Sequence, residues 1–232
     1  MTSTFYTRFG KRSLDLVLSF GGLLLLSPFL LLVAIAVKLS SSGPALFRQT
    51  RVGRFEKPFR ILKFRTMRQS SSASGSLLTA SGDSRITPLG KWLRKTKIDE
   101  LPQLFNVLAG DMSLVGPRPE VPFYTAQYSA HQKRIFAVRP GITGPSIIMD
   151  EEDLIAAQPD KEAYYVSAIM PAKLEIDLAY CQKIRFGEDL RLLFATLARL
   201  GAKLAAVFGL APPNSELHLR KVRDIPPRQS IP

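Results

Sequence analysis

The feature of this sequence that most constrains its fold is an almost wholly apolar run, LVLSFGGLLLLSPFLLLVAIAV, from Leu16 to Val37. As a helix, such a run would be roughly 33 Å long, which is enough to cross a lipid bilayer. The pair Ser27-Pro28 lies in its middle. Because proline removes a backbone donor and clashes with the preceding turn, we expect a kink there. The Ser27 hydroxyl is placed to satisfy one carbonyl that the proline leaves without a donor.

Basic residues flank the run on both sides. They are Arg8, Lys11 and Arg12 before it, and Lys38, Arg48, Arg51 and Arg54 after it. Lys and Arg favour the cytoplasmic side of a membrane, so two basic flanks are best satisfied when both ends face the cytoplasm. The run is therefore predicted to enter one leaflet, bend at Ser27-Pro28 and return. A kinked spanning helix and a buried helix of a soluble protein are the alternatives.

The composition narrows the range of partners and of chemistries. The formal net charge is +13, from 32 Lys and Arg against 19 Asp and Glu, which indicates an anionic partner. No aromatic-basic RNA motif and no basic recognition helix is evident, so we expect lipid and phosphate rather than nucleic acid. The single cysteine, Cys181, excludes an intramolecular disulfide, and two histidines without a His/Cys cluster argue against zinc. P-loop and dinucleotide-binding fingerprints are missing from the sequence.

Short secondary-structure elements follow the apolar run. Aromatic and β-branched residues alternate with cations over 45–67, which predicts strands or a hairpin around Val52-Gly53. The pattern over 85–108 predicts two short helices. Residues 122–137 are interpreted as one helix, and residues 161–185 as a helix with a break near Pro171.

The predicted fold class is α+β and mainly helical. An N-terminal re-entrant membrane helix, residues 1–39, precedes a cytoplasmic globular domain over 40–210 that contains a short hairpin or sheet and interfacial amphipathic helices. The stretch 189–208 has one apolar side and is predicted to lie in the membrane interface or against the core. The low-complexity segment 69–84 is predicted to be a mobile loop, and the Pro-rich, charged tail 211–232 to be disordered.

The adjacent carboxylates Asp99 and Glu100 precede the second of the two short helices. Alone, such a pair is a common surface feature, because a helix N-terminus favours negative charge. Arg118, however, stands between Pro117 and Pro119, which stiffen its backbone. The candidate cations in turn-rich or strand-like settings are Lys63, Arg65, Arg94, Arg118 and Arg139. Carboxylates hold Mg²⁺, Mg²⁺ bridges phosphate oxygens, and arginines bind phosphate bidentately, so this set predicts a site for a phosphorylated anion with Mg²⁺.

Three segments, ILKFRTM, ITPLGKWLRKTKIDELPQLFNVLAGDMSLVGPRPE and VRPGITG, strongly resemble the bacterial initiating sugar transferases, the small monotopic polyprenyl-phosphate phosphoglycosyl transferases. The pattern of a basic residue with Asp15, followed by an apolar run broken at Ser-Pro, is also similar to that family. The resemblance covers roughly residues 8 to 200. Residues 145–165 depart from the family pattern, so neither sugar identity nor nucleotide-site detail transfers.

The resemblance implies a membrane enzyme on the cytoplasmic face of the bacterial inner membrane, with residues 40–210 as its catalytic domain. Such an enzyme moves a sugar 1-phosphate from a UDP-sugar to a polyprenyl (undecaprenyl) phosphate and releases UMP. This reaction is the first membrane step of exopolysaccharide or glycoconjugate synthesis. The sequence leaves open which sugar is transferred and the oligomeric state, a homodimer being one option.

The resemblance also implies residue roles. Asp99 is the nucleophile that forms a covalent phosphosugar aspartate, and Glu100 is the Mg²⁺-associated carboxylate. The five cations Lys63, Arg65, Arg94, Arg118 and Arg139 contact phosphate or nucleotide. Asp177 matches an acidic position of the family's C-terminal helix, with a site role or an ion pair to a nearby arginine. The alternative function is a non-catalytic basic module that binds the membrane surface.

Overall fold

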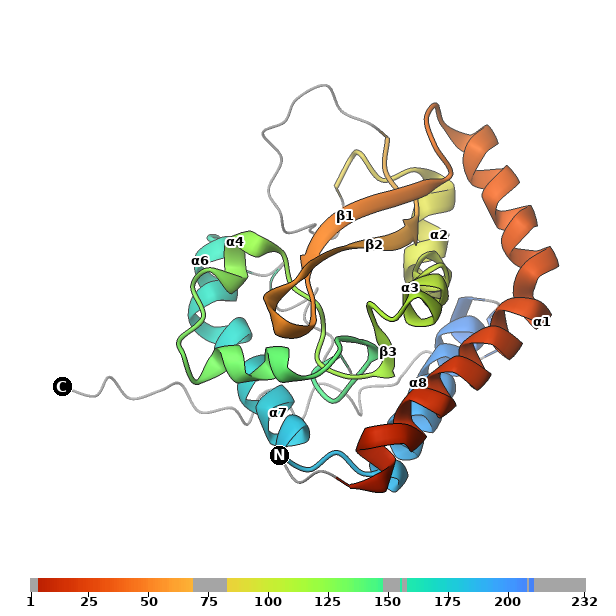
Figure 1. The fold of residues 1–232 in the computed structure, drawn as a ribbon. Coiled ribbons are helices and arrows are strands. Elements are labelled where there is room, and N and C mark those ends of the chain that lie inside the picture. The colour runs from red at the N-terminus through yellow and green to blue at the C-terminus, as the bar shows by residue number, and fades with distance from the viewer. Residues whose placement is uncertain (1–3, 69–82, 148–154, 156–157, 208, 211–232) are drawn as a thin grey trace.

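The computed structural model describes residues 4–68, 83–147, 155, 158–207 and 209–210. Within them the chain is mainly helical, with two small two-stranded sheets (Figure 1). The predicted loop 69–84 falls largely outside the described residues, and the predicted tail 211–232 does so entirely. Part of the divergent segment 145–165 also lies outside them.

The apolar run forms the long helix α1, Lys11–Ser40, which follows a short π-helical turn, η1, Tyr6–Gly10. The helix is continuous through Pro28 and changes direction near its middle, so the predicted break is a bend (Figure 1). Pro28 cannot donate to the carbonyl of Leu24, four residues earlier, and the Ser27 hydroxyl donates to that oxygen instead at 2.9 Å. This bond, predicted from the Ser-Pro pair, keeps the helix intact across the proline.

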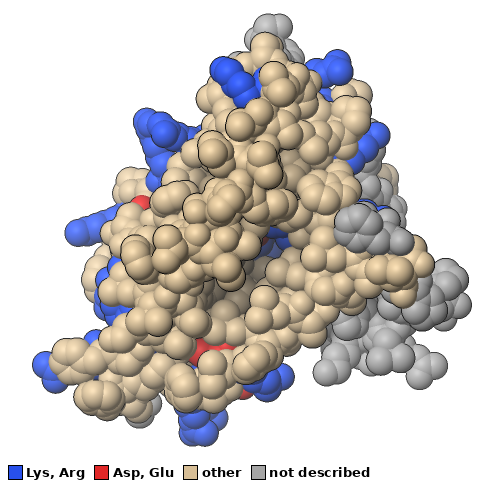
Figure 2. Space-filling view, turned by 90° about the vertical axis from the view of Figure 1, so that its right-hand side faces the viewer, with Lys and Arg blue, Asp and Glu red and all other residues tan. Residues whose placement is uncertain are grey.

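Helix α1 has a buried stripe and an exposed apolar face. The buried residues recur every three, four or seven positions: Asp15, Ser19, Leu23, Leu30, Val33 and Val37. Of the most apolar window, with mean hydropathy 2.5, only 22% is buried. The side of the molecule that carries α1 is largely uncharged where described, with Lys and Arg gathered along its margins (Figure 2). The helix is long and apolar enough to cross a membrane, and so large an exposed apolar face marks a contact surface.

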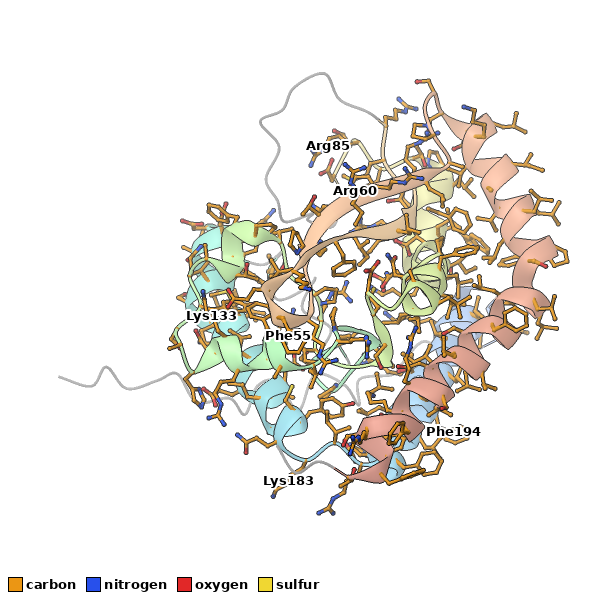
Figure 3. The ribbon with its side chains drawn as sticks, viewed as in Figure 1. Phe55, Arg60, Arg85, Lys133, Lys183 and Phe194 are labelled. Atoms are coloured by element: carbon orange, nitrogen blue, oxygen red, sulfur yellow. The ribbon has the colours of Figure 1, made fainter. Side chains whose placement is uncertain are left out.

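The predicted hairpin is confirmed. Strands β1, Leu46–Val52, and β2, Pro58–Phe64, pair antiparallel, with Phe47 opposite Lys63. The turn between them, η2, Arg54–Glu56, has positive φ at Phe55 and Glu56. Its tip rests near the helical turn η4, Gln132–Ala137, through an ion pair of 3.1 Å between Glu56 and Lys133 (Figure 3).

The two helices predicted over 85–108 are α2, Pro88–Thr96, and α3, Gln103–Ala109, with a 3-10 turn, η3, Ile98–Glu100, between them. The sequence did not predict the second sheet. Strands β3, Ser113–Val115, and β4, Gly141–Thr143, pair in parallel.

Two helix predictions in the C-terminal half need correction. The helix predicted over 122–137 is two pieces, α4, Pro122–Thr125, and η4. Ser129 and Gln132 cap each other's backbone amides, at 2.8 and 3.3 Å, and so begin a new helical turn.

The break expected near Pro171 does not occur. The helical segments α6, Lys161–Tyr164, η5, Tyr165–Ile169, and α7, Met170–Gln182, follow one another directly. Pro171 lies in the first turn of α7, and the π-helical η5 before it changes the hydrogen-bond register ahead of the proline. The last helix, α8, Phe186–Val207, agrees with the predicted amphipathic stretch. Its Leu192 is fully buried, whereas Phe194 is 66% exposed (Figure 3).

Candidate active site

Asp99 and Glu100 lie in the 3-10 turn η3, held between two helices. Helix α2 ends at Lys97, which adopts the left-handed conformation at φ 57° and so reverses the chain into η3. The start of α2 is capped by Thr87, whose hydroxyl accepts from the amide of Gly90 at 2.9 Å. The glycine is required there, because a Cβ at Gly90 would lie 2.0 Å from the carbonyl oxygen of Thr66.

Glu100 is neutralised by two cations. Its Oε1 atom accepts from Lys63 Nζ of β2 at 2.7 Å and from Arg118 Nη2 at 3.2 Å. These partners hold the pKa of Glu100 well below its ordinary value, although burial acts in the opposite direction. The carboxylate of Glu100 is therefore ionised and paired. The structure brings these three predicted residues together.

Asp99, unlike Glu100, has a buried carboxylate oxygen without a hydrogen-bond partner. It is 6% exposed, and its Oδ1 atom is buried without a hydrogen-bond partner. Burial, and then the charge of Glu100, raise the pKa of Asp99 to about 6, while Lys63, Lys97 and Arg94 act to lower it. A buried carboxylate oxygen without a donor is costly in a fold, and such groups concentrate at functional sites.

Lys63 completes the buried charge cluster. Burial lowers its pKa, and Arg118 adds to that effect, whereas Glu100 and Asp99 oppose it. Two acids and four cations, Lys63, Arg94, Lys97 and Arg118, thus interact across one region of the molecule. Such a cluster suits an anion that carries several negative oxygens.

Asn106 fixes the helix that follows the two acids against the hairpin. Its side-chain amide donates to the carbonyl of Arg60 at 2.8 Å and accepts from the amide of Leu62 at 2.9 Å. This side chain therefore extends the ladder of β2 and holds α3 beside Lys63. Asn106 was not among the residues predicted from the sequence, although a polar residue inside the apolar stretch LFNVL was a signal for it.

Arg118 lies in the loop that joins β3 to α4, and Asp177 of α7 supports this loop. The carboxylate of Asp177 is 3% exposed and accepts from the Ser146 hydroxyl at 2.8 Å. Burial raises its pKa to about 6, and the backbone amides of Ser146 and Arg118 act to lower it. Asp177 thus lies close to the backbone of Arg118, and its Oδ1 atom, like that of Asp99, is buried without a hydrogen-bond partner. Its role in the site stays a prediction.

Arg65 and Arg139 have partners away from the acids. The Arg65 guanidinium donates to the carbonyls of Val37 and Ser41 at 3.1 and 2.7 Å, and also to that of Pro44. Arg65 therefore stabilises the C-terminal end of α1, whereas the sequence predicted that it contacts phosphate. Arg139 donates through Nε to the carbonyl of Gly110 at 2.8 Å, just after α3. In this structure their guanidinium groups donate to carbonyls at or just after the C-terminal ends of α1 and α3.

The predicted metal site has no preformed cage. Among the described residues there is no group of three or more His, Cys, Asp or Glu side chains that could hold a metal ion. Mg²⁺ is, however, usually held by one or two carboxylates together with substrate phosphates and water. The ionised Glu100 beside the unpartnered Asp99 oxygen fits that smaller requirement.

Comparisons with known proteins identify the family and several relatives of this chain. A family model described as bacterial sugar transferase matches residues 6–203. The UDP-glucose:undecaprenyl-phosphate glucose-1-phosphate transferase of Caulobacter vibrioides is 40% identical over 193 residues, covering 82% of this chain and 69% of the relative. The exopolysaccharide production protein PSS of Rhizobium leguminosarum bv. phaseoli is 38% identical over 194 residues, covering 81% and 92%.

A third relative is longer. The UDP-N-acetylgalactosamine-undecaprenyl-phosphate N-acetylgalactosaminephosphotransferase of Aeromonas hydrophila is 38% identical over 200 residues, which are 82% of this chain and 43% of that protein. This chain therefore spans less than half the length of some curated relatives. The family match covers most of the chain and confirms the resemblance found in the sequence. The chain belongs to the bacterial sugar transferase family.

Proposed function

We propose that this protein transfers a sugar 1-phosphate from a UDP-sugar to undecaprenyl phosphate at the cytoplasmic face of the bacterial inner membrane. The observation that carries the proposal is the asymmetry of the two adjacent acids. Glu100 is paired with two cations, whereas Asp99 keeps a buried oxygen without a donor. The names of the relatives, which specify sugar-1-phosphate transfer to undecaprenyl phosphate, support the same reaction.

Asp99 is the proposed nucleophile. A pKa of about 6 leaves its carboxylate ionised at neutral pH. One oxygen attacks the phosphorus that bears the sugar; a bond from the aspartyl oxygen to phosphorus forms, the bond to UMP breaks, and UMP leaves. An oxygen of undecaprenyl phosphate then attacks the same phosphorus. The aspartyl bond breaks, and the undecaprenyl diphosphate sugar and the free carboxylate result.

The cations around the two acids stabilise charge in this reaction. Lys63 and Arg118, which both contact Oε1 of Glu100, are placed to bind phosphate oxygens, and Arg94 adds positive potential near Asp99. Glu100 is the residue that would hold Mg²⁺, with substrate phosphates completing its ligands. When bound, the ion supplies neutralisation of the diphosphate charge.

The attachment of α1 supports the re-entrant topology. Near its start, Arg12 donates to the carbonyls of Val107 and Leu108 at 2.7 and 3.1 Å, and Asp15 accepts from the amide of Leu114 at 2.9 Å. At its end, Arg65 holds the last carbonyls. Both ends are thus bonded to one globular body. In the variants Thr4→Cys and Ser42→Cys, the new thiol should in both cases be protected from an impermeant maleimide in intact spheroplasts, whereas a spanning helix would expose one of the two.

The decisive experiment is a UMP-release assay in detergent micelles with undecaprenyl phosphate and a panel of UDP-sugars. The panel includes UDP-glucose and UDP-N-acetylgalactosamine, which the relatives' names specify, together with UDP-di-acetamido sugars. We expect release with at least one donor, and loss of release when EDTA is added. With the lipid omitted, intact-protein mass spectrometry should find a sugar phosphate adduct on the wild type and none on Asp99→Asn. Lack of release with every donor would instead favour the non-catalytic membrane-surface module.

A further inference from the structure

The loop of residues 116–120, GPRPE, which we call the Arg118 loop, is held on its N-terminal side by strand β4. The Gly116 amide donates to the carbonyl of Thr143 at 2.9 Å, and the Pro117 carbonyl accepts from the amide of Gly141 at 2.8 Å. The two backbones are so close that a Cβ at Gly141 would lie 2.1 Å from the Gly116 nitrogen. The chain is therefore fixed up to the residue before Arg118.

The C-terminal side of the loop is held by a network around Glu120. Its Oε1 atom accepts from Arg51 Nη1 at 2.8 Å and from the Val121 amide at 3.0 Å. Its Oε2 atom accepts from the Tyr165 hydroxyl. Arg51 also donates to the carbonyl of Pro119 at 3.1 Å. Both carboxylate oxygens of Glu120 are therefore used within the network.

The network also separates two neighbouring cations. Burial lowers the pKa of Arg51, Glu120 opposes that effect, and Arg118 lies close enough that its charge lowers the pKa further. Glu120 pairs with Arg51, and Glu100 pairs with Arg118. Without Glu120, Arg118 would compete with an uncompensated guanidinium for the charge of Glu100. The pairing therefore directs Arg118 toward the acids of the site.

We propose that Glu120, held by Arg51 and Tyr165, is a positioning residue that sets the orientation of Arg118 during phosphoryl transfer. The proposal rests on the proposed function, because Arg118 acts there on the substrate's phosphates. Tyr165 belongs to η5 and stands 45 positions from Glu120 in the chain. The Tyr165 hydroxyl thus ties the C-terminal helical segment to the Arg118 loop. Small errors in the placement of such a group reduce the rate of the chemical step more than substrate affinity.

The test compares Tyr165→Phe with Tyr164→Phe, its neighbour on the same helical segment. The first substitution removes only the hydroxyl that binds Glu120 and keeps the buried ring. We expect kcat for UMP release to fall about tenfold with KM for the UDP-sugar changed less than about twofold, an effect near that of one lost hydrogen bond. Tyr164→Phe should keep the wild-type kcat.

A double-mutant cycle with Arg118→Ala shows whether Tyr165 acts through Arg118. If it does, adding Tyr165→Phe to Arg118→Ala produces no further loss of kcat. Multiplicative losses would overturn the proposal, because they assign to Tyr165 an effect independent of Arg118. Glu120→Gln should behave as Tyr165→Phe does, with a larger loss, since it removes the charge that compensates Arg51.

Hydrogen exchange measured by mass spectrometry tests the network without turnover. In Tyr165→Phe, peptides covering residues 116–121 should exchange faster than in the wild type, and in Tyr164→Phe at the wild-type rate. Equal exchange in all three proteins would overturn the proposal. A wild-type protein that releases no UMP would defeat the proposed function, and the exchange comparison would still decide whether the network holds the loop.

Discussion

Two regions of the molecule bury a carboxylate beside a lysine, and the two carboxylates differ in how many hydrogen-bond donors they have. Asp189 of α8 is 1% exposed and accepts from three donors, at 2.6 Å from Tyr6, 2.5 Å from Lys11 and 2.6 Å from Tyr180. These donors come from η1, α1 and α7, so Asp189 joins the start of α1 to the two C-terminal helices. Asp99, by contrast, lies near Lys63 but leaves one oxygen without a donor.

The difference indicates what each region does. A carboxylate with every oxygen satisfied stabilises the positions of the elements around it. A buried carboxylate with an unpartnered oxygen costs stability, and such groups concentrate at functional sites. Substitutions at Asp189 should therefore change stability, and substitutions at Asp99 should change turnover. The predictions below test this division.

The largest effect is expected for Asp99→Asn. Loss of the nucleophile should reduce UMP release by more than about a thousandfold, because the covalent step needs the carboxylate. The free energy of unfolding in detergent micelles should not fall at neutral pH, since the amide removes a buried charge that lacks a full set of partners. Turnover within tenfold of the wild type would contradict the nucleophile assignment.

The next effect is expected for Asp189→Asn. It leaves the largely buried Lys11 ammonium without its anion, and removal of one partner from a buried pair costs about 3 kcal/mol or more. Chemical denaturation in micelles measures the loss. The matched control is Glu188→Gln, the neighbouring acid, which pairs with Arg191 at the surface and should change stability by less than about 0.5 kcal/mol. Equal losses in the two variants would remove the distinction between the two regions.

The pH dependence follows from the raised pKa of Asp99. With a pKa of about 6, the reactive carboxylate is lost by protonation below pH 6, so kcat/KM should fall about tenfold per pH unit there. Stability moves in the opposite direction. Because the folded-state pKa lies above the ordinary 3.8, this group's stabilising contribution is present below pH 4 and is lost as pH rises through 6.

The Asp99→Asn variant isolates that contribution. The difference between its unfolding free energy and that of the wild type should change by about 2 kcal/mol between pH 4 and pH 7. Asp177, whose pKa is also about 6, is present in both proteins and cancels in the difference. A difference that is flat over this range would show that Asp99 titrates at its ordinary value.

The features that were predictable from the sequence are those that a local pattern of residues encodes. The hairpin, α2 and α3 were predicted because each shows its own periodicity over consecutive residues. Asp99, Glu100, Lys63 and Arg118 were found because acids and cations in one region suggest a phosphate site, and the structure brings them together.

Contacts between distant segments were not predictable in this way. Lys11 and Asp189 are 178 positions apart, and no local pattern relates them. Strands β3 and β4 have three residues each, too few to show alternation, and their pairing depends on glycines at a close approach. Arg65 and Arg139 were assigned to phosphate contacts because they match basic positions of the family's motifs, yet in the fold they donate to backbone carbonyls. A local sequence does not reveal which acceptor a guanidinium will meet.

The smallest effect is expected for Tyr6→Phe, which removes one of the three donors to Asp189. The free energy of unfolding should fall by about 1 kcal/mol, because Lys11 and Tyr180 still donate to the carboxylate and the ring keeps its edge-to-face contact with Phe186. Denaturation measures the loss, and UMP release should remain at the wild-type rate. In the Asp189→Asn background the same substitution should cost less, since its acceptor is already weakened. A loss of activity in Tyr6→Phe with unchanged stability would instead place this anchoring region within the reaction, and the division between the two buried carboxylates would fail.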